Sequence, residues 1–359
     1  MTSVTSFPKE RIKVLLLENI HPSGTQMFRD DGLSVETVSA ALGEDELCAK
    51  VEDVHLLGIR SKTKVTAKVI EAGRRLLGVG CFCIGTNQVA LEAACKRGVV
   101  VFNAPFSNTR SVAELVLCEV IGLSRQLADA SKGMHEGVWN KSATGCFEVR
   151  GKTLGIIGYG HIGRQVGVLA EALGMNVLFY DIVQQLPMGN NRDMPSLNAL
   201  LESSDFVTLH VPATEQTKKM IGPEQLRKMR PGSRLLNLSR GNVVDIEALA
   251  EALRSGHLSG AAIDVFPQEP QSNKERFVSP LQGLKNVILT PHVGGSTEEA
   301  QAAIGKEVAV TMLKFLNTGS TLQAVNFPRV EPAPLRGRHR ILNIHRKRQM
   351  KTNKIRSHE

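Results

Sequence analysis

Residues 151–181 read "GKTLGIIGYGHIGRQVGVLAEALGMNVLFYD". An apolar run is followed by three glycines in the spacing G-x-G-x-x-G, then by a helical pattern and a second apolar run that ends at Asp181. Two short apolar runs separated by one amphipathic helix are typical of parallel strands joined by a crossover helix. Because parallel sheets are covered by helices on both faces, this stretch predicts an α/β fold.

The three glycines of this stretch have separate physical tasks. Gly158 permits a tight turn after the strand, Gly160 lets a pyrophosphate approach the backbone, and Gly163 lets helix and strand pack closely. The N-terminal end of the helix favours the negative charge of a pyrophosphate. Asp181 can accept hydrogen bonds from ribose hydroxyls and would repel a 2′-phosphate. The stretch therefore predicts a site for NAD rather than NADP, with a glycine-rich turn that binds nothing as the alternative.

The same alternation of strands and helices extends on both sides of this stretch. Such alternation predicts parallel sheets with crossover helices. A helix expected over residues 107–127 leads from a first α/β series into a second, and a helix over 297–319 leads back. The predicted strands cover residues 13–19, 33–39, 54–60, 75–82, 98–104, 153–158, 176–181, 205–212, 233–241, 258–266 and 286–295.

The overall composition is that of a globular protein. Of the 359 residues, 42% are apolar and 22% are charged. No run reaches the ~18 apolar residues that a membrane-spanning helix needs, and we read no targeting segment in the first residues. None of the six cysteines forms a C-x-x-C pair, which favours free thiols of a reducing compartment over a metal site. We expect a cytoplasmic protein without a membrane partner or a bound metal.

The net charge of +9 is concentrated at the C-terminal end. Residues 331–359 hold nine Lys and Arg residues against two acidic residues, so the rest of the chain is nearly neutral. A charge confined to a tail is weak evidence for a nucleic-acid-binding domain. We expect nucleic acid not to be a partner and the tail to be disordered.

Reactive side chains stand where several of the later strands are predicted to end. Ligands bind beyond the carboxyl ends of the strands in an open parallel sheet. The planar guanidinium of Arg240 suits a carboxylate or a polarised carbonyl. His292 is a candidate acid/base, and Glu269 could hold its ring and stabilise its charged form. The other residues at these ends are His210 and Asp264. The alternatives are a surface-paired arginine, a solvated glutamate and a histidine, His210, that simply ends a strand.

The ordered motifs of the second series resemble those of a known family. "GYGHIG" (158–163), "NLSRGNVVD" (237–245), "AIDVFPQEP" (262–270) and "TPHVGGST" (290–297) stand in the order and spacing of the D-isomer-specific 2-hydroxyacid dehydrogenases. "CFCIGTNQVALEAACKRGVVVFNAPFSNTRSVAEL" (81–115) is more similar still to family members that act on D-3-phosphoglycerate. The resemblance extends over most of the chain.

The resemblance implies two doubly wound parallel-sheet domains. A Rossmann NAD-binding domain over residues 107–296 would be inserted into a discontinuous, flavodoxin-like substrate-binding domain made of residues 1–106 and 297–330. Relatives often continue into an ACT domain that binds serine. Here the family pattern stops within residues 331–359, so we expect a truncated ACT domain, of which this basic tail is the remnant, and no feedback inhibition by serine.

The resemblance also implies a catalytic trio of Arg240, Glu269 and His292. His292 would take the hydroxyl proton from C2 of D-3-phosphoglycerate while a hydride passes to NAD. The product would be 3-phosphohydroxypyruvate, at the start of the phosphorylated route to L-serine. Arg240 would hold the substrate carboxylate, and Glu269 would pair with His292. A homodimer or homotetramer is expected from the same resemblance.

Further contacts follow from the resemblance. The phosphate contacts that it implies are Arg60 and Ser61, with Asn108 nearby and Lys141 reaching in from a second subunit. This set is chemically sensible, because a phosphate suits convergent cations and hydroxyl donors. Lys62 would keep a charge that relatives often place there as Arg. Arg240 and His292 complete the substrate-binding set. The expected NAD contacts are Gly158, Gly160, His161, Ile162, Gly163, Asp181, His210, Leu238, Ser239, Arg240, Asp264, His292, Val293, Gly294 and Gly295.

Two alternatives remain open. Another enzyme on the same framework, such as a glycerate, glyoxylate, lactate or 2-oxoglutarate reductase, would have no use for the phosphate cluster at "RSKT" (60–63). A dehydrogenase-like NAD-sensing corepressor, with the basic tail on nucleic acid, belongs to a different class. The intact trio argues against it, because charged groups held together without a catalytic use cost stability.

Overall fold

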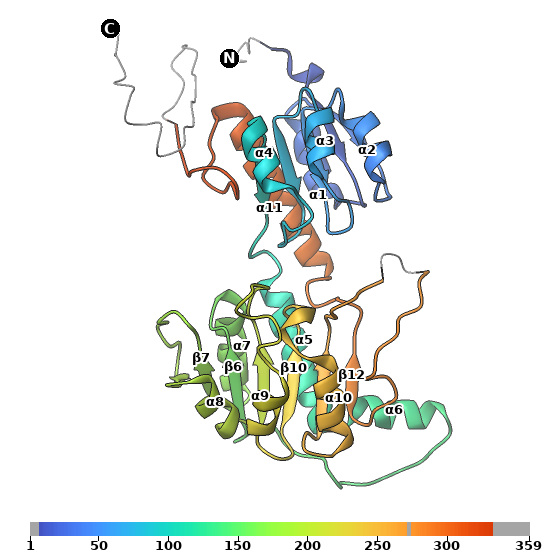
Figure 1. Ribbon diagram of the computed structural model, residues 1–359, viewed down its shortest axis with the longest axis vertical. Helices are drawn as coiled ribbons and strands as arrows, with labels where there is room; N and C mark the ends of the chain where they lie inside the picture. The colour runs from blue at the N-terminus through green and yellow to red at the C-terminus, as the bar shows by residue number, and fades with distance from the viewer. Residues whose placement is uncertain (1–6, 271–273, 333–359) are drawn as a thin grey trace. The chain divides into compact units, whose positions relative to one another are not determined.

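The chain folds into two compact units, which the computed structural model describes over residues 7–270 and 274–332. Unit 1 comprises the residues up to Pro105 and those from Ile304 onward, and unit 2 comprises Phe106–Ala303 (Figure 1). Each unit has one parallel sheet with helices on both faces, which confirms the predicted fold class. The domain boundaries at 106/107 and 296/297 stay predictions. From residue 333 on, the predicted tail and ACT remnant lie outside the described residues.

Unit 1 contains a five-stranded sheet in which every pairing is parallel. Its strand order, β2-β1-β3-β4-β5, is that of flavodoxin-like folds. In this order the strand sequence reverses between β1 and β3, so the loops that follow these two strands meet at the edge where ligands bind. The strands are β1 (Lys13–Leu16), β2 (Ser34–Thr37), β3 (Leu56–Ile59), β4 (Gly78–Cys81) and β5 (Val100–Asn103).

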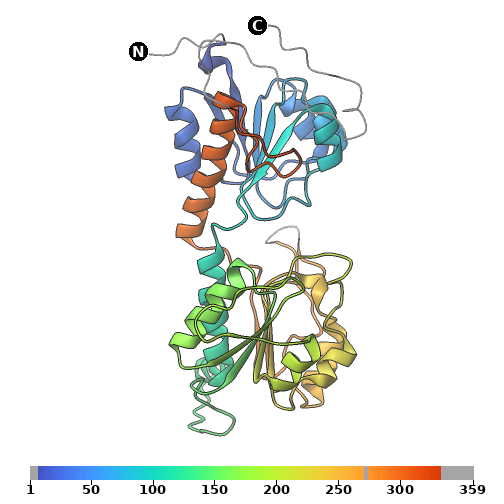
Figure 2. The same cartoon turned by 90° about the vertical axis from the view of Figure 1, so that its left-hand side faces the viewer.

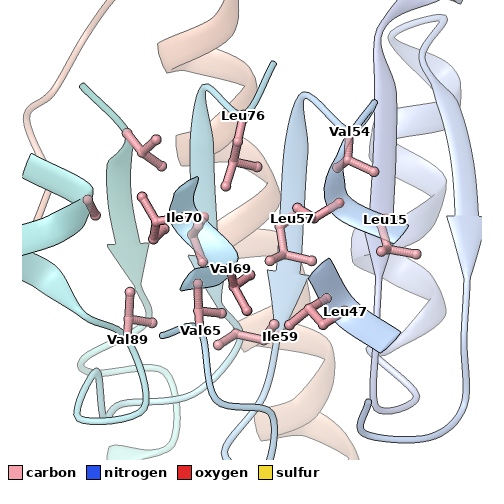
Figure 3. Packing of buried hydrophobic residues seen from close by; sticks show 14 of the residues in the cluster. Leu15, Leu47, Val54, Leu57, Ile59, Val65, Val69, Ile70, Leu76 and Val89 are labelled. Carbon is pink, nitrogen blue, oxygen red and sulfur yellow. The ribbon is translucent and has the colours of Figure 1, made fainter. Parts of the chain in front are cut away.

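Helices cover both faces of this sheet (Figure 2). On one face α2, α3 and α4 pack over a core that includes Leu47 and Val69, both fully buried (Figure 3). On the other face α1 and α11 pack over a second core that includes Phe28 and Met312. The bounds are η1 Lys9–Arg11, α1 Pro22–Asp30, α2 Glu44–Val51, α3 Ala67–Ala72, α4 Leu91–Arg97 and α11 Glu298–Thr318.

Unit 2 contains a seven-stranded parallel sheet of order β12-β11-β10-β9-β6-β7-β8. The order reverses between β6 and β9, as in Rossmann folds, and dinucleotides bind beyond the carboxyl ends of the strands at such a point. The strands are β6 (Thr153–Ile157), β7 (Asn176–Tyr180), β8 (Arg192–Asp193), β9 (Phe206–Leu209), β10 (Arg234–Asn237), β11 (Gly260–Ile263) and β12 (Val287–Leu289).

The helices of unit 2 also lie on both faces of its sheet (Figure 2). On one face α5 and α7 bury Val116 and Val166. On the other face α8, α9 and α10 bury Leu200, Leu226 and Leu249. The bounds are α5 Thr109–Ser124, α6 Leu127–His135, α7 His161–Ala172, α8 Leu197–Ser203, α9 Pro223–Lys228, η2 Gly241–Val243 and α10 Ile246–Arg254. No helix within the described ranges is long and apolar enough to cross a membrane.

Local sequence accounts for several element ends. The side chain of Asp245 accepts a hydrogen bond from the backbone N–H of Ala248 and so caps α10, and Ser196 and Thr66 cap α8 and α3 in the same way. Gly98 has a φ of 79° directly after α4, which is the left-handed C-cap that a glycine after an apolar pattern predicts.

The strands are shorter than the apolar runs predict. The run from residue 75 predicts an early start for β4, but β4 begins at Gly78, and β12 ends at Leu289 although its predicted run continues to residue 295. An apolar pattern reports burial, and buried residues continue beyond the last paired residue of a strand. β8 is not predicted at all, because its two residues are polar and exposed.

We predict that Gly24→Ala destabilises unit 1 by about 1–3 kcal/mol, the usual cost of overpacking. A Cβ at Gly24 in α1 would lie 2.6 Å from the backbone oxygen of Gly305 in α11, where neither backbone can yield cheaply. Chemical denaturation of the variant measures the change. The matched control is Gly43→Ala, whose Cβ would meet nothing within 4 Å. Equal stability of the two variants would contradict the prediction.

Candidate active site

In the glycine turn after β6, neighbouring backbone crowds the first and last glycines, whereas the middle glycine faces open space. Gly158 has a φ of 90°, and a Cβ there would lie 2.7 Å from the backbone oxygen of His210. A Cβ at Gly163 would lie 2.3 Å from the backbone oxygen of Gly158. A Cβ at Gly160 would meet nothing within 4 Å. The outer glycines are therefore required by the fold itself, whereas Gly160 faces space that another molecule can occupy.

Asp181 stands beside this turn, directly after β7. Its Oδ2 accepts a hydrogen bond from the backbone N–H of Tyr159 (2.8 Å), and its Oδ1 accepts one from Val183 N–H (3.0 Å). Each carboxylate oxygen has a second lone pair. The structure thus brings Asp181, the predicted ribose acceptor, to the predicted pyrophosphate turn. Its carboxylate oxygens can each accept a further hydrogen bond.

His161 and Ile162 form the first turn of α7. The His161 ring lies against Phe106, with 3.8 Å between the ring centroids, and Ile162 packs on the apolar core beneath. His161 and Phe106 also line a hollow of about 510 Å³ whose lining includes Arg164 but no member of the predicted trio.

Asn237, the last residue of β10, shapes the loop that carries Leu238, Ser239 and Arg240. Its buried Oδ1 accepts hydrogen bonds from Ser239 N–H (3.1 Å) and Ser239 Oγ (2.8 Å), and its Nδ2 donates to the backbone oxygen of Arg240 (3.0 Å). The Arg240 side chain donates to the backbone oxygen of Ser239 (2.7 Å). Beyond the end of β10, these hydrogen bonds of the Asn237 side chain fix the backbone from which the Arg240 side chain extends.

The loops after β10 and β11 touch each other through their backbones. A Cβ at Gly241 would lie 2.0 Å from the carbonyl carbon of Phe266. Only glycine fits at this crossing, which brings the loop of Arg240 against the loop of Glu269.

Asp264 organises the chain after β12. Its Oδ1 accepts hydrogen bonds from Thr290 Oγ1 (2.6 Å) and Val293 N–H (2.8 Å), and its Oδ2 accepts one from Gly294 N–H (2.8 Å). Its backbone oxygen accepts from His292 N–H at 2.8 Å. Asp264 is 1% exposed, so the Thr290 hydroxyl and the two backbone N–H groups take the place of water around a buried carboxylate.

His292 and Glu269 form a close pair. His292 Nδ1 lies 2.9 Å from Glu269 Oε2, while Glu269 Oε1 accepts from Phe266 N–H at 3.1 Å. His292 has a φ of 55°, a left-handed conformation that is uncommon for residues other than glycine and concentrates at functional sites. The structure holds this ring at the end of a constrained loop.

The electrostatics of the pair extend to Arg240. The hydrogen bond and charge of Glu269 raise the pKa of His292 above its ordinary value, against partial burial and the positive charge of Arg240. Burial works to raise the pKa of Glu269, but the hydrogen bond and charge of His292, with help from Phe266 N–H and Arg240, bring it below its ordinary value. The positive charge of Arg240 thus acts on both partners, and its loop meets the loop of Glu269 where Gly241 crosses Phe266.

His210 follows β9 next to the glycine turn. Burial lowers its pKa to about 3, so the ring is neutral at physiological pH. One ring nitrogen lies 3.1 Å from Thr208 Oγ1, and the other, Nδ1, is buried without a hydrogen-bond partner among the described residues. A buried polar atom without a partner is uncommon, which suits a ring that meets a ligand.

The predicted substrate contacts fall in both units. Asn108 lies beside the His292 loop, since a Cβ at Gly295 would meet the Asn108 amide nitrogen at 2.2 Å, and its Oδ1 is buried with no partner in the described chain. Arg60 and Ser61 belong to unit 1. Lys141, between α6 and β6, is exposed and makes no hydrogen bond or ion pair with the described residues.

Sequence reasoning missed three buried or hydrogen-bonded polar residues in or near these networks. They are Asn237, Thr290 and Glu119 of α5, which is 2% exposed. Burial, and then the negative charge of Asp264, raise the pKa of Glu119 to about 8. The sequence signal was present only for Glu119, as an acid inside an otherwise apolar helix stripe. Within residues 7–270 and 274–332, no three His, Cys, Asp or Glu side chains form a group suited to a metal.

Comparison with known proteins places this site in a family. The family model for the NAD-binding domain of D-isomer specific 2-hydroxyacid dehydrogenases matches residues 117–294. D-3-phosphoglycerate dehydrogenase from Dictyostelium discoideum is 56% identical over 345 residues, which cover 96% of this chain and 85% of that protein. The enzyme of the same name from Escherichia coli K12 is 54% identical over 96% of this chain and 84% of its own length.

Solved structures agree with this relationship. D-lactate dehydrogenase from Aquifex aeolicus, in complex with NAD and lactic acid, has a TM-score of 0.76 at 26% identity, covering 88% of this chain and 99% of that one. The TT0316 protein from Thermus thermophilus has a TM-score of 0.77 at 31% identity, covering 85% and 97%. The chain therefore belongs to the D-isomer specific 2-hydroxyacid dehydrogenase family and, within it, to the D-3-phosphoglycerate dehydrogenases.

Proposed function

We propose that the protein oxidises D-3-phosphoglycerate to 3-phosphohydroxypyruvate with NAD, the first step of the phosphorylated route to L-serine. The observation that carries this proposal is the His292–Glu269 pair beside the charge of Arg240. It occurs in a chain that is 56% identical over 345 residues to a D-3-phosphoglycerate dehydrogenase. The pair supports the type of reaction, and the family relationship supports the substrate.

The residues divide the reaction between them. Because Nδ1 of His292 is taken by Glu269, Nε2 is the ring nitrogen left to accept the hydroxyl proton. Glu269 stabilises the imidazolium that results and fixes the ring orientation. Arg240 holds the substrate carboxylate and polarises the oxygen at C2. NAD, when bound, supplies the hydride acceptor, so alcohol and NAD become ketone, NADH and one proton.

The residues at the glycine turn fit NAD. Open space at Gly160 leaves room for a pyrophosphate near backbone N–H groups at the start of α7. Asp181 has free lone pairs for ribose hydroxyls and a charge that disfavours a 2′-phosphate. The neutral His210 ring offers an unused buried nitrogen. Residues 238–240 and 292–295 lie on the loops after β10 and β12, and we assign them to the same cofactor.

We further propose that Arg60, Ser61 and Asn108 contact the substrate and that Lys141 serves the site of a second subunit, in a homodimer or homotetramer. Figures 1 and 2 show the segment between α6 and β6 at the opposite end of unit 2 from the loops after β10 and β12. Lys141 belongs to this segment and is exposed, which supports a role in a partner subunit.

We place the enzyme in the cytoplasm. All six cysteines are free thiols, and this supports a reducing compartment.

The direct test of the proposed function is the appearance of NADH with D-3-phosphoglycerate, compared with D-lactate and D-glycerate. We expect kcat/KM for the phosphorylated substrate to exceed both others by at least about 100-fold, since a charged contact contributes about 1.5–3 kcal/mol and several converge on the phosphate. Comparable values for all three acids would overturn the substrate assignment while leaving the dehydrogenase chemistry intact.

We predict that Glu269→Gln moves the acidic limb of the oxidation pH profile to lower pH. In the native protein Glu269 raises the pKa of His292. Oxidation needs the neutral ring, so its rate falls as the pH drops through that raised pKa. Without the carboxylate the pKa of His292 falls, and the plateau rate also drops, by about 10- to 100-fold, because the ring is less well held.

The measurement is kcat/KM for oxidation between pH 5 and 9, with Glu224→Gln as an exposed charge-loss control on α9. The control should leave the profile where it is. A profile that is flat in the native protein, or a limb that moves to higher pH in Glu269→Gln, contradicts the assigned role.

We predict that Lys141→Ala raises KM for D-3-phosphoglycerate by about tenfold or more and leaves KM for NAD unchanged. Lys132→Ala, an exposed lysine of α6, is the matched control. Mixing Lys141→Ala subunits with His292→Ala subunits decides whether Lys141 acts across an interface. If it does, mixed oligomers contain sites with both residues intact and regain activity; if it acts within its own subunit, no such site forms.

A further inference from the structure

A buried glutamate in unit 1 binds the backbone of the loop that carries Arg60 and Ser61. Glu18, which follows β1 and is 8% exposed, accepts hydrogen bonds from three backbone donors of this loop. Its Oε1 accepts from Arg60 N–H (3.1 Å) and Thr63 N–H (2.8 Å), and its Oε2 accepts from Lys62 N–H (3.0 Å). One carboxylate therefore fixes the backbone of residues 60–63.

The glutamate itself is held in an unusual conformation. Glu18 has a φ of 61°, in the left-handed region that residues other than glycine, asparagine, aspartate and histidine seldom adopt. The backbone oxygen of Glu18 accepts from the Arg60 guanidinium at 3.4 Å. Such a conformation persists where the surroundings over-determine it, and it concentrates at binding sites.

Gln88 holds the same loop from another side. Its Nε2 donates to the backbone oxygen of Arg60 (2.8 Å) and lies within hydrogen-bond distance of the Gly85 oxygen (3.2 Å) and Cys83 Sγ (3.3 Å). The loops after β1, β3 and β4 are thus joined at the carboxyl edge of the sheet, with the loop of residues 60–63 clamped between an acceptor and a donor.

This arrangement decides which groups of the loop can meet an anion. Loops that bind phosphate often use their backbone N–H groups, but here three of them are occupied by Glu18. Ser61 and Lys62 are exposed and Arg60 is half-buried, so most of the contacts have to come from these side chains, with Ser61 N–H as the one backbone donor that Glu18 does not bind. A negative charge next to such a loop works against an anion by simple repulsion, and its benefit must come from positioning.

We propose that Glu18 is a positioning residue for the phosphate of the substrate: it binds three of the four backbone N–H donors of residues 60–63 and thereby presents Arg60, Ser61 and Lys62 as a fixed cluster. This inference rests on the proposed function, because it concerns recognition of the phosphate. It predicts that removing a negative charge weakens the binding of an anion.

The test compares 3-phosphohydroxypyruvate with hydroxypyruvate, which lacks the phosphate, in NADH consumption by the full chain. We expect Glu18→Gln to reduce the ratio of the two kcat/KM values at least about tenfold, while the value for hydroxypyruvate stays within about twofold of the native one. Glu36→Gln, an exposed carboxylate on β2 that pairs with Lys50, is the control and should leave the ratio unchanged.

Two other results for Glu18→Gln would contradict the proposal. An equal loss for both substrates shows a merely structural role, and a rise in the ratio shows that Glu18 acts only by its charge; either overturns the proposal. If the native protein does not prefer the phosphorylated substrate, the proposed function fails first and this inference fails with it.

Gln88→Met keeps the test decisive if Glu18→Gln does not fold. Methionine matches the size of Gln88 but cannot donate to Arg60, and no charge changes. We expect the ratio to fall about threefold, because one neutral hydrogen bond is lost. An unchanged ratio in this variant would overturn the positioning of the loop.

Discussion

The carboxylate of Asp264 is the interaction on which the arrangement of the candidate active site depends. The carboxylate accepts hydrogen bonds from Thr290 Oγ1, Val293 N–H and Gly294 N–H, and the backbone oxygen of Asp264 accepts one from His292 N–H. Because the group is buried, losing any of these donors would leave acceptor capacity without water to satisfy it. Because of this free-energy cost, the chain keeps these hydrogen bonds, and they hold His292 in its left-handed backbone conformation. Glu269 follows β11, as Asp264 does, so the hydrogen bonds of Asp264 also help to set the distance between His292 and Glu269.

The fold could be predicted because buried parallel strands leave short apolar runs in the sequence. Both sheets, the glycine turn and the helix of residues 298–318 follow from that signal. The strand ends could not be predicted, because apolar burial continues beyond the last paired residue. β8 could not be predicted either, because its two exposed polar residues leave no hydrophobic pattern. The proximity of the loops that carry His292, Glu269 and Arg240 could be predicted, because the carboxyl ends of parallel strands share one edge; the catalytic roles of the three residues stay a prediction.

The supporting residues could not be predicted in the same way. Asn237 and Glu18 are single polar residues after ordinary apolar runs, and their importance comes from the backbone groups that they bind, which only the folded chain brings to them. The acid at Glu119 was visible as an interruption of an apolar stripe, but its raised pKa depends on burial that only the folded chain provides. The contacts assigned to Arg60, Ser61 and Lys141 rest on the family resemblance, because charged loop residues are common on any surface.

The contact between Gly241 and Phe266 limits how this enzyme can vary. With 2.0 Å between an imagined Cβ and the Phe266 carbonyl carbon, any larger residue at 241 would push apart the loops of Arg240 and Glu269. Kinetic defects caused by such a residue would resemble the loss of a reactive group, although no reacting atom had been changed. In a mutational survey, position 241 would therefore score as catalytic for purely steric reasons, and directed evolution toward new 2-hydroxy acids would have to leave this glycine in place.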